Sequence, residues 1–175
     1  MPSPTRQRGI TLVEAAVVVA VIAITTSAAA PSLQRLIERH RLEAAATQLA
    51  ADLQLARNES LARNRIVRLS WHAGSACYLL HTGAADACRC DAGGAAQCTP
   101  GQTSIRSVPW EAGSRISLQS STASIAFDPL HGTVTPTATW RITAADGRAI
   151  HHVVNVMGRV RSCSPLAAVP GYRAC

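Results

Sequence analysis

Residues 10–30 read ITLVEAAVVVAVIAITTSAAA, an apolar run that a single charged residue, Glu14, interrupts. At about 1.5 Å rise per residue, a helix of this length spans roughly 30 Å, the thickness of a bilayer's hydrocarbon core. Arg6 and Arg8 precede the run without an acid beside them, and the positive-inside rule places such an N-terminus in the cytoplasm. The stretch predicts a single membrane-crossing helix, with the rest of the chain on the outer side.

Glu14 is the unusual residue of this helix. A carboxylate inside an apolar segment costs about 2.5–3.5 kcal/mol on insertion scales, so it normally has a partner. A cleaved secretory signal, for which Ala28, Ala29 and Ala30 supply small residues near a cleavage site, leaves Glu14 without a role. A class of protein in which such a carboxylate has a regular partner would therefore explain Glu14.

Residues 8–14, RGITLVE, resemble the processing site of type IV pilins and pseudopilins. The resemblance implies that residues 1–9 are a leader peptide, which a prepilin peptidase removes after Gly9 before methylating the new N-terminus. That N-terminus is Ile10, where the family more often has Phe. Glu14 is then expected to pair with the N-terminal amine of a neighbouring subunit in a filament. The protein would lie in the inner membrane before assembly, and afterwards in the periplasm and in a pilus on the cell surface.

The remaining sequence divides into a helical and a β-rich part. Between residues 31 and 64 apolar side chains recur at spacings near three, four and seven, which predicts an amphipathic continuation of the first helix: Leu33, Leu36, Ile37, Leu42, Leu49, Leu53 and Leu61. From residue 65 to 175 short β-like runs alternate with Gly, Pro, Ser and Asp, over residues 66–71, 77–81, 104–108, 115–118, 124–127, 139–143 and 150–156. The expected fold class is α+β, a type IV pilin-like fold. In it, a long N-terminal helix, half transmembrane and half amphipathic, packs on a C-terminal antiparallel sheet or sandwich outside the cytoplasm.

The composition is that of a folded, basic protein. The 175 residues allow one domain with an extension, and 47% hydrophobic with 15% charged residues exceeds what a disordered chain carries. All 17 basic residues are arginines, and against 10 acids they give a net charge of +7. An acidic partner suits this charge, although drift in genome composition explains the complete absence of Lys more simply.

The cysteines indicate an oxidising compartment. An even number in a membrane-targeted protein favours disulfides. Residues 83–103 form too long a structureless loop unless disulfides constrain it, and a bridge between Cys163 and Cys175 is a further candidate among 15 possible pairings. Zinc is the weaker interpretation because the paired C-x2-4-C spacing is missing. The disulfide candidates are Cys77, Cys88, Cys90, Cys98, Cys163 and Cys175.

Catalytic signatures are missing from the sequence. Ser, His and Asp occur without a nucleophile elbow, and neither a phosphate-binding glycine loop nor an HExxH helix is present. His151 and His152 adjoin in an expected strand, where successive side chains point to opposite faces, so we expect one buried and one exposed. The sequence predicts a protein that is not an enzyme and takes no cofactor or metal.

The most informative late feature is Gly158-Arg159-Val160-Arg161. Glycine permits a turn or bulge. In an extended segment the two arginines project from one face about 7 Å apart with Val160 facing inward, and two guanidinium forks suit successive phosphates. Between residues 141 and 175 five arginines stand against one acid, Asp146: Arg141, Arg148, Arg159, Arg161 and Arg173. The simpler alternative is a solvated pair of arginines without a ligand.

Taken together, the pilin start, residues 127–132 (FDPLHG) and residues 158–161 (GRVR) resemble the GspH/FimT family. FimT-type minor pilins of this family carry a C-terminal GRxR motif associated with DNA binding during natural transformation. The resemblance implies that Gly158 shapes the motif and that Arg159 and Arg161 contact DNA. Charge alone makes Arg141, Arg148 and Arg173 candidate auxiliary contacts.

The expected function is that of a type IV pilus minor pilin that binds extracellular DNA for uptake. Because aromatic residues are few, we expect phosphate contacts without sequence preference rather than base stacking. The other expected partners are major and minor pilins, the prepilin peptidase and the inner membrane. Two alternatives stay open: a structural minor pilin that primes assembly, and a minor pseudopilin of a type II secretion system.

Overall fold

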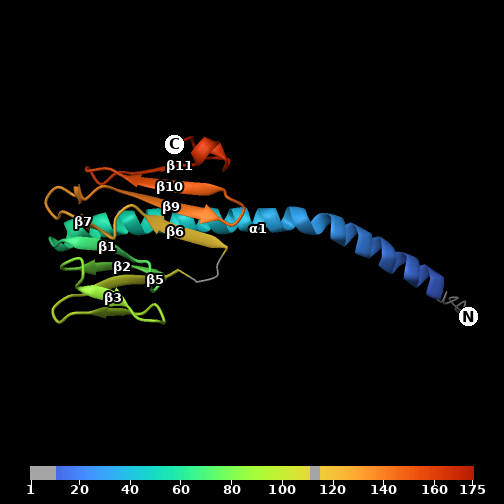
Figure 1. Ribbon diagram of the computed structural model, residues 1–175, viewed down its shortest axis with the longest axis horizontal. Coiled ribbons are helices and arrows are strands. Elements are labelled where there is room, and N and C mark those ends of the chain that lie inside the picture. The colour runs from blue at the N-terminus through green and yellow to red at the C-terminus, as the bar shows by residue number, and fades with distance from the viewer. Residues whose placement is uncertain (1–10, 111–114) are drawn as a thin grey trace, which may run out of the picture. The chain divides into compact units, whose positions relative to one another are not determined.

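The computed structural model describes residues 11–110 and 115–175 of the chain (Figure 1). The chain forms two compact units that divide after Ile37. One long helix, α1 (Leu12–Arg63), extends over both units, and the short helix η1 (Pro165–Ala167) lies near the C-terminus. The strands, all in the second unit, are β1 (Val67–His72), β2 (Cys77–Thr82), β3 (Cys88–Cys90), β4 (Ala96–Cys98), β5 (Ser104–Pro109), β6 (Ile116–Ser120), β7 (Ser124–Phe127), β8 (Val134–Thr135), β9 (Ala138–Ala144), β10 (Ala149–Val154) and β11 (Val160–Cys163).

Both ends of α1 have recognisable caps. At the start, the N–H of Glu14 donates to Thr11 Oγ1 (3.2 Å) and the N–H of Ala15 donates to the Thr11 carbonyl (3.1 Å), so Thr11 is the N-cap. At the end, Asn64 adopts a positive φ of 49° and the N–H of Arg65 donates to the Ser60 carbonyl. This is the left-handed termination that Asn tolerates well. The predicted helix ends one residue later than the observed one.

The part of α1 in the first unit has the composition of a membrane span. Its exposed large apolar side chains range from Ile37, which is 42% exposed, to Leu12, which is 86% exposed. Among the described residues, α1 is the one helix whose length and hydropathy suffice to cross a membrane. The predicted apolar helix is therefore present, and the predicted amphipathic segment continues it.

In the second unit one face of α1 is buried. Leu42, Ala46, Leu49, Leu53 and Ala56 are fully buried at alternating spacings of four and three, which is the period of a helix face. They belong to one hydrophobic core with the inner faces of both large sheets. The amphipathic pattern predicted this face, because the three leucines of the series belong to the predicted stripe.

A buried carboxylate also lies on this face. The side chain of Asp52 accepts a hydrogen bond from the Tyr78 hydroxyl (2.6 Å) and pairs with Arg106 Nη1 (3.2 Å). Burial, together with the adjacent carboxylate, raises the pKa of Tyr78, so the phenol remains a donor. Gln48 Nε2 of the same helix also donates to Asp52 (3.1 Å). The buried acid is therefore satisfied, and it ties the helix to strands β2 and β5.

Two antiparallel sheets pack on the helix in the second unit. The five-stranded sheet has the order β5-β2-β1-β7-β8, and the four-stranded sheet has the order β11-β10-β9-β6 (Figure 1). Burial alternates along strands such as β9, where Trp140 and Ile142 are fully buried while Arg141 between them is exposed, whereas all residues of β2 are buried. This period-two pattern confirms the predicted α+β class with an antiparallel sheet.

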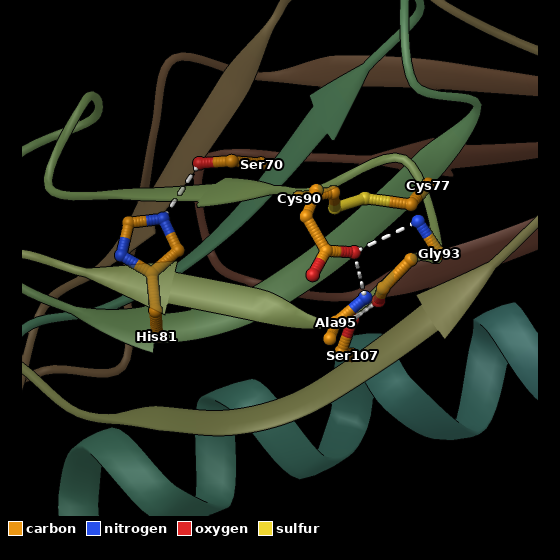
Figure 2. Close-up of a disulfide and its surroundings, with 9 residues drawn as sticks. Ser70, Cys77, His81, Cys90, Gly93, Ala95 and Ser107 are labelled. Carbon is orange, nitrogen blue, oxygen red and sulfur yellow. Dashed lines mark hydrogen bonds between the residues drawn. A yellow bond between two sulfur atoms is a disulfide. The ribbon is translucent and has the colours of Figure 1, made fainter.

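The segment of residues 83–103 is not the irregular loop that its composition predicts. It contains the hairpin β3–β4, in which Cys88 and Cys98 are directly opposite and disulfide-bonded. A second disulfide joins Cys90 to Cys77 of β2, and Asp91 Oδ1 accepts the N–H groups of Gly93 and Ala95 (both 2.9 Å) in the turn (Figure 2). Strands of three residues show no detectable alternation, so the prediction was wrong about the strands, whereas the expected disulfides are present.

The third disulfide joins Cys163 to Cys175. It closes the C-terminal tail onto the end of β11, which is the pairing proposed for these two residues. All six cysteines are therefore oxidised, and no thiolate remains for zinc. The described residues contain no cluster of three or more His, Cys, Asp or Glu side chains that could hold a metal ion.

Most predicted strands are displaced by one or two residues at their ends. The ends of β6 and β10 differ most, by two residues each, and β10 ends at Val154 although the apolar run continues to residue 157. Residues 155 and 156 were predicted as strand but belong to a tight turn, because the Asn155 side chain and Gly158 favour turn geometry there. The short strands β8 and β11 were not predicted.

Candidate nucleic-acid interface

The arginine motif lies on the hairpin that joins β10 to β11. Val154 and Val160 are opposite each other in the ladder, and the N–H of Asn155 donates to the Arg159 carbonyl (3.2 Å). Inside this loop the N–H of Gly158 donates to the Asn155 carbonyl (2.9 Å), and Asn155 Oδ1 accepts the N–H of Arg159 (2.9 Å). The result is a turn followed by a glycine bulge, which fixes where the chain enters β11.

Gly158 is required at its position for two reasons. Its φ of +71° lies in the left-handed region, and a Cβ atom there would overlap the carbonyl oxygen of Gly132. Gly132 belongs to the FDPLHG segment, has a φ of +63°, and lies against the side chain of Arg57. Two of the motifs identified in the sequence therefore meet at their glycines.

Arg57 of α1 holds these two loops together. Its Nε donates to the Gly132 carbonyl (3.1 Å), and its side chain would lie 3.0 Å from a Cβ at Gly158. Sequence reasoning missed this residue, since an arginine on an amphipathic helix is usually solvated. A signal was nevertheless present: Arg57 follows the buried Leu53 by four residues, on the face of the helix that points to the core.

The two motif arginines are on the solvent side of the hairpin. Arg159 and Arg161 are exposed, whereas Val160 between them is half-buried and packs against the core. Arg161 is directly opposite Val153 of β10. The alternation expected for an extended segment is therefore present over these three residues.

A third arginine shares the outer face of the four-stranded sheet. Arg141 of β9 is opposite His151 of β10, and His151 is two residues before Val153 on that strand. Residues directly opposite each other in a sheet share a face, so Arg141 and Arg161 are on the same surface, with Cα atoms about 12 Å apart. None of the strands β6, β9, β10 and β11 contains an acidic residue.

The other two candidate arginines are placed differently. Arg148 lies in the turn between β9 and β10, at the opposite end of β10 from Gly158, and its Nε pairs with Asp146 Oδ2 (2.7 Å). Arg173 lies in the C-terminal tail, where its carbonyl accepts the N–H of Ser164 (2.8 Å) just after β11. The structure therefore brings Arg159, Arg161 and Arg141 onto one sheet, with Arg173 near its edge and Arg148 at its far end.

The adjacent histidines are divided between the faces of the sheet, as expected. His152 is 1% exposed and bridges to the helix, because its Nε2–H donates to the Ala46 carbonyl (2.8 Å) while Nδ1 accepts from the Ser162 hydroxyl (2.8 Å). Burial lowers the pKa of His152. Burial and the positive charge of Arg141 lower the pKa of the half-buried His151. Both imidazoles are therefore neutral at pH 7, and the arginines supply the charge of this face.

The candidate residues of the N-terminal site are at the other end of the chain. Gly9 and Ile10 lie outside the described residues. Glu14 is in the first turn of α1 and is exposed. The positive end of the helix dipole favours a carboxylate at this position.

Comparisons with known proteins bear on the family and the fold of this chain. The model of the family described as type II transport protein GspH matches residues 45–158, and the prokaryotic N-terminal methylation motif matches residues 4–30. A crystal structure of the type IV minor pilin FimU from Pseudomonas aeruginosa has a TM-score of 0.56 at 19% identity, over 77% of this chain and 96% of that one. The minor pseudopilin EpsH from Vibrio cholerae has a TM-score of 0.48 at 13% identity, over 71% of this chain and 97% of that one.

The comparison with curated proteins gave no significant match. The family match nevertheless covers more than half of the chain, including the helix face with Arg57, both glycine loops and the start of the arginine motif up to Gly158. The likeness to FimU concerns the fold, in which a long N-terminal helix packs on antiparallel sheets. With its N-terminal methylation motif and this fold, the chain belongs to the GspH family and is a minor pilin or pseudopilin.

Proposed function

We propose that this chain is a type IV pilus minor pilin that binds extracellular DNA without sequence preference, as a receptor for DNA uptake in natural transformation. One observation carries the proposal. The exposed Arg159 and Arg161 emerge from an edge hairpin held by Arg57, on a sheet whose strands contain no acid and whose outer face also bears Arg141. The protein acts as an adaptor and not as a catalyst.

The ligand chemistry follows from the guanidinium groups. Each planar fork donates two parallel hydrogen bonds to a phosphate, and contacts to phosphate position a protein on DNA without reading bases. With about two to four phosphates neutralised, log Kd should change with log salt with a slope of about 0.9 per phosphate, and the affinity should be micromolar or weaker. Several subunits in one pilus would add avidity.

The proposal also includes the path to the cell surface. The prepilin peptidase removes residues 1–9 after Gly9 and methylates Ile10, and the match of residues 4–30 to the methylation motif supports this step. Before assembly, α1 anchors the protein in the inner membrane with its N-terminus in the cytoplasm. In the filament Glu14 pairs with the N-terminal amine of a neighbouring pilin, and the second unit reaches the periplasm and then the cell surface.

DNA binding by the full chain in a neutral detergent tests the proposal. Fluorescence anisotropy with a labelled duplex is measured over a series of salt concentrations. We expect salt-dependent binding by the wild type, and loss of most of it in Arg159→Ala/Arg161→Ala. The control is Arg41→Ala/Arg89→Ala, which removes two exposed arginines of α1 and β3. This control has the same net charge as Arg159→Ala/Arg161→Ala, the hairpin variant. If the control loses as much affinity as the hairpin variant, net charge rather than this site explains binding.

A role in type II secretion is the second candidate, because the matched family carries that description. A pseudopilin of such a system would recognise proteins instead of DNA. In that case the wild type would bind no DNA at any salt concentration, and the double arginine variant would leave secretion or assembly unchanged. A purely structural minor pilin would instead lose piliation when the two arginines are replaced.

A further inference from the structure

Exposed apolar side chains gather beside the arginine motif, at the end of the second unit where α1 ends. Leu130 is 73% exposed, Met157 58% and Val156 55%. We call these three residues the apical cluster. Exposed apolar groups that gather on neighbouring loops often mark a contact surface. The glycines and arginines of the two motifs give no reason for Leu130 and Met157 to be apolar and exposed.

The cluster is held together by its backbone. The N–H of Val134 donates to the Val156 carbonyl (2.8 Å), and Gly132 and Gly158 touch closely. The loop that carries Leu130 is closed by Asp128, whose Oδ1 accepts the N–H groups of Leu130 (3.0 Å) and His131 (2.9 Å). The two loops therefore form a fixed apolar tip rather than two independent segments.

The position of the tip relative to Arg159 decides what can cover it. Met157 and Arg159 belong to the same five-residue loop, and the N–H of Arg159 is fixed by the Asn155 side chain. Because Met157 is only two residues before Arg159, a duplex whose phosphate is held by Arg159 comes within reach of the exposed Val156 and Met157. Asp128 lies in the loop of Leu130, where its Oδ1 accepts backbone N–H groups and lies 3.3 Å from His131 Nδ1.

We propose that the apical cluster is a wedge, in which Leu130 and Met157 enter the minor groove of duplex DNA held by Arg159 and Arg161. This inference rests on the proposed DNA binding. Leucine and methionine inserted at a base step unstack it partially and bend the duplex. The cluster contains no aromatic ring, so it is unsuited to stack the bases of a single strand. Flexible pyrimidine–purine steps such as TA should therefore unstack most readily, while the phosphate contacts of the arginines stay independent of sequence.

The test uses the full chain in neutral detergent and duplexes with 2-aminopurine beside a central TA step, whose fluorescence rises when the base unstacks. We expect the wild type to raise the fluorescence on binding. Leu130→Ser/Met157→Ser should abolish the rise and weaken binding about tenfold, as expected for the loss of two apolar contacts. Its salt dependence should stay unchanged, because these side chains release no counterions. Arg159→Ala/Arg161→Ala should instead lower the salt slope.

Leu166→Ser is the matched control, since Leu166 is 96% exposed on η1 and should change neither signal. If Leu130→Ser/Met157→Ser binds DNA and raises the fluorescence like the wild type, the wedge is refuted while the arginine site stands. The wedge is also refuted if Leu130→Ser/Met157→Ser binds DNA normally but fails to assemble with other pilins. The apical cluster would then be a contact with a neighbouring subunit. If the wild type binds no duplex at all, the proposed function and the wedge fail together.

Discussion

At the scale of single residues, Gly158 determines how the chain reaches Arg159 and Arg161. Its left-handed φ and its contact with the Gly132 carbonyl leave no space for a side chain, and the side chain of Arg57 closes the same space from the helix. The arginines contact the ligand in the proposed function, whereas these three residues only position them. Replacing a positioning residue should therefore alter stability and binding together.

Gly158→Ala should destabilise the protein by about 2–3 kcal/mol, because backbone strain is combined with a steric overlap. Two glycines separate the causes. Gly147 has a φ of +86°, but a Cβ atom there would meet no other atom within 4 Å, so Gly147→Ala introduces backbone strain without steric overlap. Gly74→Ala introduces neither strain nor overlap. Urea denaturation of the three variants measures the differences. If Gly158→Ala and Gly147→Ala lower the free energy of unfolding equally, the contact of Gly158 with Gly132 contributes nothing to stability.

At the scale of elements, the four-stranded sheet presents different chemistry on its two faces. The inner face is apolar around Trp140 and Ile150, both fully buried, while the outer face bears Arg141, His151 and Arg161. His151 is the titratable group of this outer face. Arg141 from β9 is its charged neighbour, and Cys175 Sγ from the C-terminal tail lies 3.8 Å from its Nδ1.

DNA binding should become tighter on acidification, because a bound polyanion favours the imidazolium form of His151. In the protein without DNA, burial and the charge of Arg141 lower the pKa of His151. The imidazole is therefore neutral at pH 7 and gains its positive charge only at lower pH. Binding at about pH 5.5 should show a salt slope steeper by about 0.9 than at about pH 7.5. His151→Gln should remove this increment. If the variant keeps the full pH dependence, His151 does not face the bound DNA.

At the scale of the whole second unit, each of the two large sheets contains a fully hydrogen-bonded, buried histidine. His152 joins the four-stranded sheet to α1 through the Ala46 carbonyl. In the five-stranded sheet, His81 is fully buried, with Nδ1–H donating to the Thr82 carbonyl (3.0 Å) and Nε2 accepting from the Ser70 hydroxyl (2.9 Å), as Figure 2 shows for the latter pair. Burial lowers the pKa of both histidines, so the folded state holds them neutral.

Stability should therefore fall as the pH drops below about 6.5. The unfolded chain has ordinary histidines and binds more protons than the folded state between the lowered and the ordinary pKa, so unfolding becomes easier with acidification. Each unit of pKa depression costs about 1.4 kcal/mol once the pH lies below the folded value. Urea midpoints between about pH 7.5 and pH 5 measure this effect. His152→Gln, whose amide N–H retains a donor for the Ala46 carbonyl, should flatten the dependence, whereas His40→Gln at an exposed position should leave it unchanged.

The sequence by itself determined the elements whose period is long enough to detect. The apolar run with Glu14, the leucine spacing of α1 and the alternation in strands such as β9 each reflect one buried face, and these patterns sufficed for the fold class. The two-residue spacing of Arg159 and Arg161 also suffices to place them on one face. Short strands escaped detection, because the three residues of β3 or β4 contain hardly more than one period. These strands depend on disulfides and on packing against β2.

Only the tertiary structure decided which distant residues meet. The contact of Arg57 with Gly132 and Gly158 joins three segments that no local pattern connects, and the diagonal placement of Arg141 and Arg161 depends on strand register. The same holds for the apical cluster, whose Leu130 and Met157 are 27 positions apart in the chain. Periodicity records which side of an element is buried, but it contains no information on which other element covers it. Close contacts between glycines, shared faces and loop clusters therefore emerge only when the sheets pack on the helix.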